Sequence, residues 1–286
     1  SKQSDLALAT YEEAVKLFGK SDTLDVMKSE ILLDQHKEDE ALQLLKPWEE
    51  KNTGIRQVYS LLAFLNLQNK NSKEAVRVLE KGIVNTKDDI LYLDLADAYA
   101  ANKKDKQAFE SLKTAFNSSK VEFAEKYRVM FTLLGSVNKM PLDEMQELAN
   151  ILVLKHPRIA DSHVAKGNVL WKRNNLQEAR SMFLTAIGIN ANHVDAWRML
   201  INIELALNEV NDAIQHSLEA LQANPKNPML SYFSGIAYMV NHDLDNARKM
   251  MESALDNSTE ENTYMQSLIY AGLGDLYHEL KMASAS

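Results

Sequence analysis

Two side-chain amides are the residues of this chain whose type and spacing best suit the binding of another molecule. Asn168 and Asn202 lie 34 residues apart. A side-chain amide can donate a hydrogen bond to a peptide carbonyl and accept one from a peptide N–H, so such a pair can hold the backbone of a bound chain whatever its sequence. The alternative is that both amides are merely hydrated. We take the two asparagines as the centre of a hypothetical binding site.

Residue types that could support catalysis or bind a metal do not form a recognised pattern. None of the seven histidines belongs to an H-E-x-x-H pair or has a ligand partner at helical spacing. Residues 243–246 lack the glycine and the distant glutamate of a calcium loop. The chain has no cysteine for a thiolate site or a disulfide. We therefore expect no enzyme activity, no catalytic residue, no metal and no cofactor.

The elements that position the two amides follow from a repeat of small residues. These residues recur at almost constant distance, with Met145 in the one gap of the series: Ala7, Ala41, Ala75, Ala108, Met145, Ala179, Ala213 and Ala247. Successive members lie 34, 34, 33, 37, 34, 34 and 34 residues apart. This period is the length of one helix-turn-helix unit. We predict an all-α chain of stacked helical hairpins, elongated because each hairpin buries its apolar side only against its neighbours.

The residues around the small positions repeat as well. The chain contains Tyr92-x2-Leu95-Ala96-x2-Tyr99, Ala179-x3-Phe183-x2-Ala186, Trp197-x2-Leu200 and Tyr270-x2-Leu273-Gly274-x2-Tyr277. These spacings resemble the tetratricopeptide repeat (TPR) pattern W-x2-L-G-x2-Y…A-x3-F…P. The resemblance implies a right-handed α-solenoid of about seven helix-turn-helix units with half-units at the ends. It also implies a protein–protein interaction scaffold.

We expect a single continuous array over residues 1–286. The 37-residue interval marks an irregular, degenerate unit at about residues 117–158. Incomplete units are expected at about residues 1–20 and 262–286, which makes the sequence look like a fragment of a longer protein, of bacterial origin by its resemblance.

Glycine and proline positions give further local predictions. Gly167, Gly235 and Gly274 are expected where the two helices of a unit approach each other closely. Pro47 falls inside the second helix of the first complete unit. Because proline removes a helical hydrogen bond and clashes with the preceding turn, it predicts a kink or an early helix end near Lys46.

The resemblance also implies where a partner binds. In the family, the first helices of the units line a concave face that binds peptide segments or partner helices. Carried onto this chain, that hypothetical groove includes Asn168, Trp171, Lys172, Arg198, Asn202, Tyr232, Ile236 and Met239. The last three have the spacing of an apolar groove, although residues at helical spacing belong to a core more often than to a site.

Charge restricts the class of partner. The net charge is −8, with 40 acidic and 32 basic residues spread along the chain. This argues against nucleic acid, whose phosphates require clustered lysine and arginine. There is no apolar run of 18 residues for membrane insertion, and Ser1 leads into a polar segment without a cleavable signal. We expect a protein or peptide partner, in the cytoplasm or a bacterial envelope.

Two other readings remain open. The array can be the substrate-recruiting region of a larger enzyme, for example a glycosyltransferase, whose catalytic domain lies outside this sequence. Open terminal helices can also support homo-oligomer formation.

Overall fold

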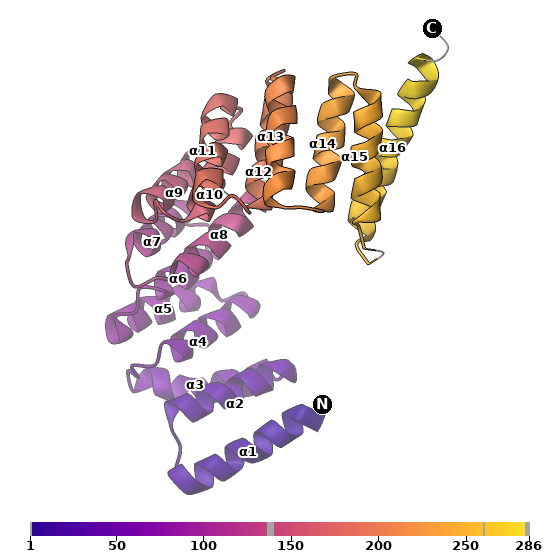
Figure 1. The fold of residues 1–286 in the computed structure, drawn as a ribbon. Coiled ribbons are helices and arrows are strands. Elements are labelled where there is room, and N and C mark those ends of the chain that lie inside the picture. The colour runs from indigo at the N-terminus through magenta and orange to yellow at the C-terminus, as the bar shows by residue number, and fades with distance from the viewer. Residues whose placement is uncertain (1, 136–139, 260, 284–286) are drawn as a thin grey trace. The chain divides into compact units, whose positions relative to one another are not determined.

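The computed structural model describes residues 2–135, 140–259 and 261–283, and these ranges contain sixteen α-helices and no strand (Figure 1). The helices are α1 (Lys2–Phe18), α2 (Asp22–Asp34), α3 (Glu38–Glu50), α4 (Arg56–Gln68), α5 (Ser72–Thr86), α6 (Leu91–Ala101), α7 (Asp105–Asn117), α8 (Phe123–Gly135), α9 (Leu142–Lys155), α10 (Ala160–Lys172), α11 (Leu176–Ile189), α12 (Val194–Ala206), α13 (Val210–Ala223), α14 (Pro228–Val240), α15 (Leu244–Asp256) and α16 (Thr263–Ala283). The predicted all-α helical repeat is confirmed.

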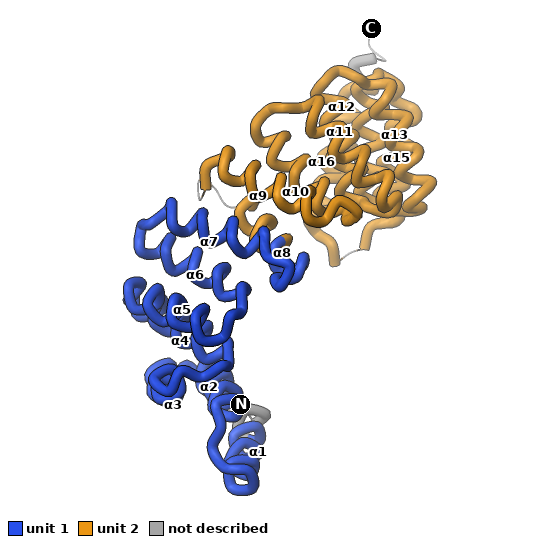
Figure 2. Tube along the Cα trace, turned by 90° about the vertical axis from the view of Figure 1, so that its left-hand side faces the viewer, with its two compact units in different colours: residues 1–126 blue, residues 127–286 orange. Residues whose placement is uncertain are grey.

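The chain divides into two compact units, residues 1–126 and 127–286, which are coloured separately in Figure 2. In the first, the pairs α2–α3, α4–α5 and α6–α7 pack as hairpins, and α1 packs against α2. In the second, α10–α11, α12–α13 and α14–α15 pack as hairpins, α9 packs against α10, and α16 packs against α14 and α15. The single array over residues 1–286 stays a prediction, as do the bounds of its irregular unit, part of which (136–139) lies outside the described residues.

Small residues at the predicted interval lie where helices pack most closely. Ala41, Ala75, Ala179, Ala213 and Ala247 are fully buried. At such a contact a larger side chain would force the backbones apart, because protein interiors are packed as densely as crystals. The alanine repeat in the sequence is therefore a repeat of helix-crossing points.

Two of the three predicted glycine contacts are present, and one is not. A Cβ added to Gly167 would lie 2.8 Å from Cζ of Phe183, and one added to Gly235 would lie 2.7 Å from Cγ of Met251. Nothing lies within 4 Å of a Cβ added to Gly274. The prediction for Gly274 is wrong because no second helix in the described chain covers that side of α16.

Six of the hairpin turns end their first helix in the same way. A residue with φ between 56° and 62° follows each of these helices: His36, Lys70, Lys103, Asn174, Asn208 and His242. In the α10–α11 turn, the N–H of Asn175 donates to the carbonyl of Leu170 at 2.9 Å, and that of Asn174 donates to Trp171 at 2.9 Å. This pair of bonds is a Schellman motif, which satisfies the last carbonyls of a helix. It fixes the point where each chain reversal occurs.

Pro47 does not end its helix. The α3 helix continues through Pro47 to Glu50, so the predicted early end near Lys46 is wrong. The next residue supplies a compensating contact: Nε1 of Trp48 donates to Oδ2 of the buried Asp25 at 2.7 Å. A hydrogen bond to a buried carboxylate is worth about 1.5–3 kcal/mol, which offsets much of the cost of about 3 kcal/mol for proline in a helix interior.

Among the residues described, no helix has both the length and the apolar character needed to cross a bilayer.

Candidate functional site

The predicted binding residues all lie on three first helices of residues 127–286. Neighbouring first helices contact one another, α10 with α12 and α12 with α14, and each intervening second helix packs against both of its neighbours. The side chains that project from α10, α12 and α14 on the side away from the second helices therefore form one surface, which we name the first-helix face.

The two asparagines occupy equivalent places on this face. Asn168 and Asn202 are each the ninth residue of their helix, α10 and α12. Both are partly exposed. Neither side-chain amide forms a hydrogen bond with any residue that the structure describes. Both amides therefore keep their donors and acceptor available to water or to a bound chain.

The last turn of α10 adds an aromatic and a cationic side chain. Trp171 is 45% exposed, an unusual exposure for the largest apolar side chain. Lys172 is exposed and has no ion-pair partner among the described residues. Arg198, one helix further on, is less available because its Nε lies 3.3 Å from Oδ1 of Asp195 in an exposed ion pair. Such pairs contribute little energy, so Arg198 can exchange Asp195 for another anion.

Asp161, near the start of α10, adds an acidic group on the same side, and its two partners were not identified from the sequence. Oδ1 of Asp161 lies 3.0 Å from Nε2 of His193, and the hydroxyl of Tyr127 on α8 also hydrogen-bonds to Asp161. Burial, the Asp161 charge and this hydrogen bond raise the pKa of Tyr127 to about 12, so its hydroxyl keeps its proton. His193 is fixed from its other side, because Nδ1 accepts from the N–H of Ala196 at 3.2 Å. The interval from Tyr127 to Asp161 is again 34, a signal hidden by the irregular unit.

The predicted apolar residues of α14 are less open than the residues of α10. Tyr232, Ile236 and Met239 are partly buried and pack against a core that α15 and α16 build around Met251 and Ile269. Burial raises the pKa of the Tyr232 hydroxyl, with smaller contributions from Asp275 and Tyr264. These three residues form part of the packing between α14 and α16. This agrees with the alternative that residues at this helical spacing belong to a core and not to a groove.

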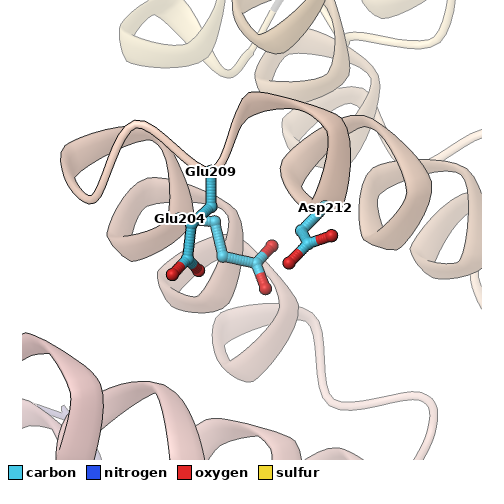
Figure 3. A group of neighbouring side chains, drawn as sticks. All are labelled: Glu204, Glu209 and Asp212. Atoms are coloured by element: carbon cyan, nitrogen blue, oxygen red, sulfur yellow. The ribbon is translucent and has the colours of Figure 1, made fainter.

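A group of carboxylates lies between the second helices and not on the first-helix face. Glu204, Glu209 and Asp212 each place an oxygen within 4.8 Å of the others (Figure 3). Arg180 occupies their centre: its Nε is 2.9 Å from Oε1 of Glu204 and 3.2 Å from Oε2 of Glu209, and its Nη2 is 3.0 Å from Oδ2 of Asp212. A guanidinium already supplies the charge that a metal ion would bring. The group is an ion-pair network that joins α11, α12 and α13.

His216 completes this network from α13. Its Nδ1 lies 2.8 Å from Oε1 of Glu204, whose side chain is fully buried. Burial raises the pKa of Glu204, although the hydrogen bonds from His216 and Arg180 act in the opposite direction. A charge at this depth is tolerated only when it is paired and hydrogen-bonded, as it is here. Glu204 was not identified from the sequence because nothing in its local spacing sets it apart.

Comparison with known proteins finds a family match and a solved structure of similar fold. Residues 154–228 match the family model described as tetratricopeptide repeat. The C-terminal part of a TPR repeat-containing protein from Cytophaga hutchinsonii has a similar structure, with a TM-score of 0.55 at 12% identity over 85% of this chain and 98% of that one. A tetratricopeptide repeat protein from Parabacteroides merdae gives a TM-score of 0.44 at 12% identity over 93% of this chain and 99% of that one.

One curated protein also shares sequence with this chain. The human protein O-mannosyl-transferase TMTC3 is 27% identical over 100 residues, which are 35% of this chain and 11% of that protein. The helical hairpins, the repeated motif and the family match over residues 154–228 lead to one conclusion. Residues 154–228 form tetratricopeptide repeats within an all-α chain of helical hairpins.

Proposed function

We propose that this chain is a non-catalytic scaffold whose first-helix face, in residues 127–286, binds an extended segment of another protein. Asn168 and Asn202 hold the backbone of the segment by hydrogen bonds to its carbonyl and N–H groups. Trp171 packs against an apolar side chain of the segment, and Lys172 binds an acidic one. The partner is a protein or peptide, and no nucleic acid or membrane is involved.

The observation that carries the proposal is the pair of asparagine amides without a hydrogen-bond partner among the described residues. Some helical asparagines bond to the preceding turn, as Asn66 does to the carbonyl of Leu62 at 2.8 Å and Asn117 does to that of Lys113 at 3.0 Å. Asn168 and Asn202 do not, although both are partly shielded from water. A partner chain would satisfy both without a change in the fold.

The proposal is tested by removing both amides and comparing with a matched pair. Peptides selected from a random displayed library against the wild-type chain are measured by fluorescence anisotropy. The variant Asn168→Ala/Asn202→Ala should weaken their binding by about 1–3 kcal/mol, which is about fivefold to a hundredfold, without a comparable loss of unfolding free energy. The control Asn150→Ala/Asn211→Ala removes two exposed amides of the second helices α9 and α13. Equal affinity of wild type and the first variant would refute the proposal.

The match with an O-mannosyl-transferase supports a second candidate function. In that case the chain recruits substrate for a glycosyltransferase, with the same first-helix face binding the acceptor polypeptide. The longest natural polypeptide that contains this sequence would then transfer a sugar to a peptide acceptor, and the Asn168→Ala/Asn202→Ala variant would raise KM for the peptide. Absence of any transfer by that polypeptide would leave the scaffold function alone.

A further inference from the structure

A cleft of about 600 Å³ opens between the α2–α3 hairpin and the last turns of α4. Its size lies in the range of small-ligand and side-chain pockets, about 300–1,000 Å³. Leu33 and Phe64 form its apolar part, and the carboxylates of Asp34, Glu38 and Asp39 line the same space. Further helices pack on both sides of this group, α1 against α2 and α5 against α4. The cleft is therefore bounded by elements inside the stack.

Phe64 presents an aromatic ring to this cleft. It is 47% exposed, although phenylalanine is among the residues most often buried. Phe64 is the ninth residue of α4, the place that Asn202 occupies in α12. The fold accepts a polar side chain at this place, so the packing of the helices does not demand an aromatic ring there. The exposed ring is a surface on which another group can stack.

The three carboxylates of the cleft have no partner of their own. None of them forms an ion pair or a side-chain hydrogen bond with any residue that the structure describes. Glu38 and Asp39 lie in the first turn of α3, where the helix dipole favours a negative charge. Asp34 is the last residue of α2, where the same dipole disfavours it. Helix stability therefore explains two of the carboxylates and not the third.

A second cleft of the same kind shows that the fold does not require these charges. It measures about 310 Å³ and lies between the α10–α11 turn and Leu207, which follows α12. Among the residues that line it, Glu178 alone carries a carboxylate. The residue of α10 that corresponds to Asp34 is Lys172, the last of its helix, as the dipole prefers. A cleft at this place thus recurs, whereas the ring with three carboxylates belongs to the α2–α3 hairpin.

We propose that this cleft binds an arginine side chain from a basic segment of another protein. The guanidinium pairs with Asp34 and with the carboxylates at the start of α3, and its plane stacks on Phe64. Arginine suits the cleft better than lysine because its planar, weakly hydrated head stacks on aromatic rings and binds carboxylates through two N–H groups. The other polar groups of the lining, those of His36, Gln68 and Asn69, offer further acceptors to the guanidinium.

The probe for this proposal is Nα-acetyl-arginine amide, followed through TROSY spectra of the isotope-labelled protein. The amide signals of residues 33–39 and 64–69 should shift in a saturable way. Nα-acetyl-citrulline amide has nearly the same shape without the charge. It should bind at least about tenfold more weakly, because hydrogen bonds between charged groups are roughly twice as strong as neutral ones. Nα-acetyl-lysine amide should also bind more weakly, since lysine neither stacks nor forks.

A matched pair of variants separates the cleft from the general charge of the protein. Asp34→Asn/Glu38→Gln should weaken binding of the arginine probe by about fivefold or more, because it removes two charge-assisted partners. The control Glu50→Gln/Asp105→Asn removes the same charge at the last residue of α3 and the first residue of α7. Asp34 and Glu38 occupy the same places in α2 and α3, so the effects on the helix dipole are matched. The control should bind like wild type.

Three results would overturn the proposal. In the first, the arginine and citrulline probes bind equally, so that apolar contact alone accounts for binding. In the second, the control variant loses as much affinity as Asp34→Asn/Glu38→Gln, so that net charge alone accounts for it. In the third, free arginine binds more tightly than the peptide Ac-Ala-Ala-Arg-Ala-Ala amide, so that the cleft serves a small molecule and not a protein segment. Unchanged circular dichroism of each variant shows that a loss of binding is not a loss of fold. None of these results depends on the function proposed for the first-helix face, which lies on α10, α12 and α14.

Discussion

Replacing Gly235 by alanine is expected to destabilise residues 127–286, whereas the same replacement at Gly274 is expected to stabilise them. Both glycines lie inside helices and occupy the same position of the repeat motif. They differ in what surrounds them. The pair therefore separates the intrinsic preference of a helix for alanine from the packing of the α14–α15 crossing.

The magnitude follows from two terms. Alanine is favoured over glycine in a helix interior by about 0.8–1.0 kcal/mol, and this term is common to both positions. At Gly235 the new Cβ would lie 2.7 Å from Cγ of Met251, a fully buried side chain, and 3.3 Å from a backbone oxygen. Overpacking of this kind costs about 1–3 kcal/mol. The two variants should therefore differ by about 1–3 kcal/mol, with Gly274→Ala the more stable.

The assay is urea unfolding followed by circular dichroism at low protein concentration, with hydrogen exchange of the α14 and α15 amides as a local readout. Gly235→Ala should lower the exchange protection of both helices and leave the first hairpins of residues 1–126 unaffected. Gly235→Leu, which adds more volume, should cost still more. If both alanine variants were stabilised to the same extent, Met251 could move aside freely and the close crossing would not depend on Gly235.

Two further outcomes are expected in residues 1–126. Trp48→Phe should lower the unfolding free energy by about 1–3 kcal/mol in urea titrations, because it removes a hydrogen bond from the buried Asp25, and an unchanged midpoint would contradict this. Burial tends to raise the pKa of Glu49, but hydrogen bonds from Lys81 and Arg77 outweigh burial and lower it below its ordinary value of 4.5. A lowered carboxyl pKa contributes stability that is present above pH 4.5 and is lost as the pH falls through the lowered value. Glu49→Gln should therefore flatten the fall of unfolding free energy with acidification below pH 4.5, and an unchanged pH profile would contradict the assignment.

The sequence was sufficient for the fold because its repeated residues report on local packing. Ala179 and Gly167 belong to a short motif, and each is small because a neighbouring helix lies against it. From the motif alone, Gly274 was also predicted to lie at a close contact between two helices. It could not reveal that α16 lacks a covering helix, because that depends on what packs against the helix and not on the helix itself.

The candidate site was less predictable than the fold. Asn168 and Asn202 could be placed by counting within the repeat. The partners of Asp161, which are Tyr127 and His193, were not found by this count because the irregular unit interrupts the period and His193 lies just outside a helix. Tyr232 was placed at the correct repeat position, but its partial burial depends on α16, an element distant from it in sequence.

The two kinds of polar residue on α12 show what distinguishes a structural group from a binding group in a repeat protein. Glu204 lies on the side of the helix that the second helices cover, where Arg180 and His216 use both of its oxygens. Asn202 lies two residues earlier, on the first-helix face, and has no such partner among the described residues. Each repeat offers the same positions to the chain, so the backbone does not decide between these roles. The two roles differ in whether the neighbouring hairpins supply a hydrogen-bond partner. Where the hairpins supply none, a second molecule can form the hydrogen bond.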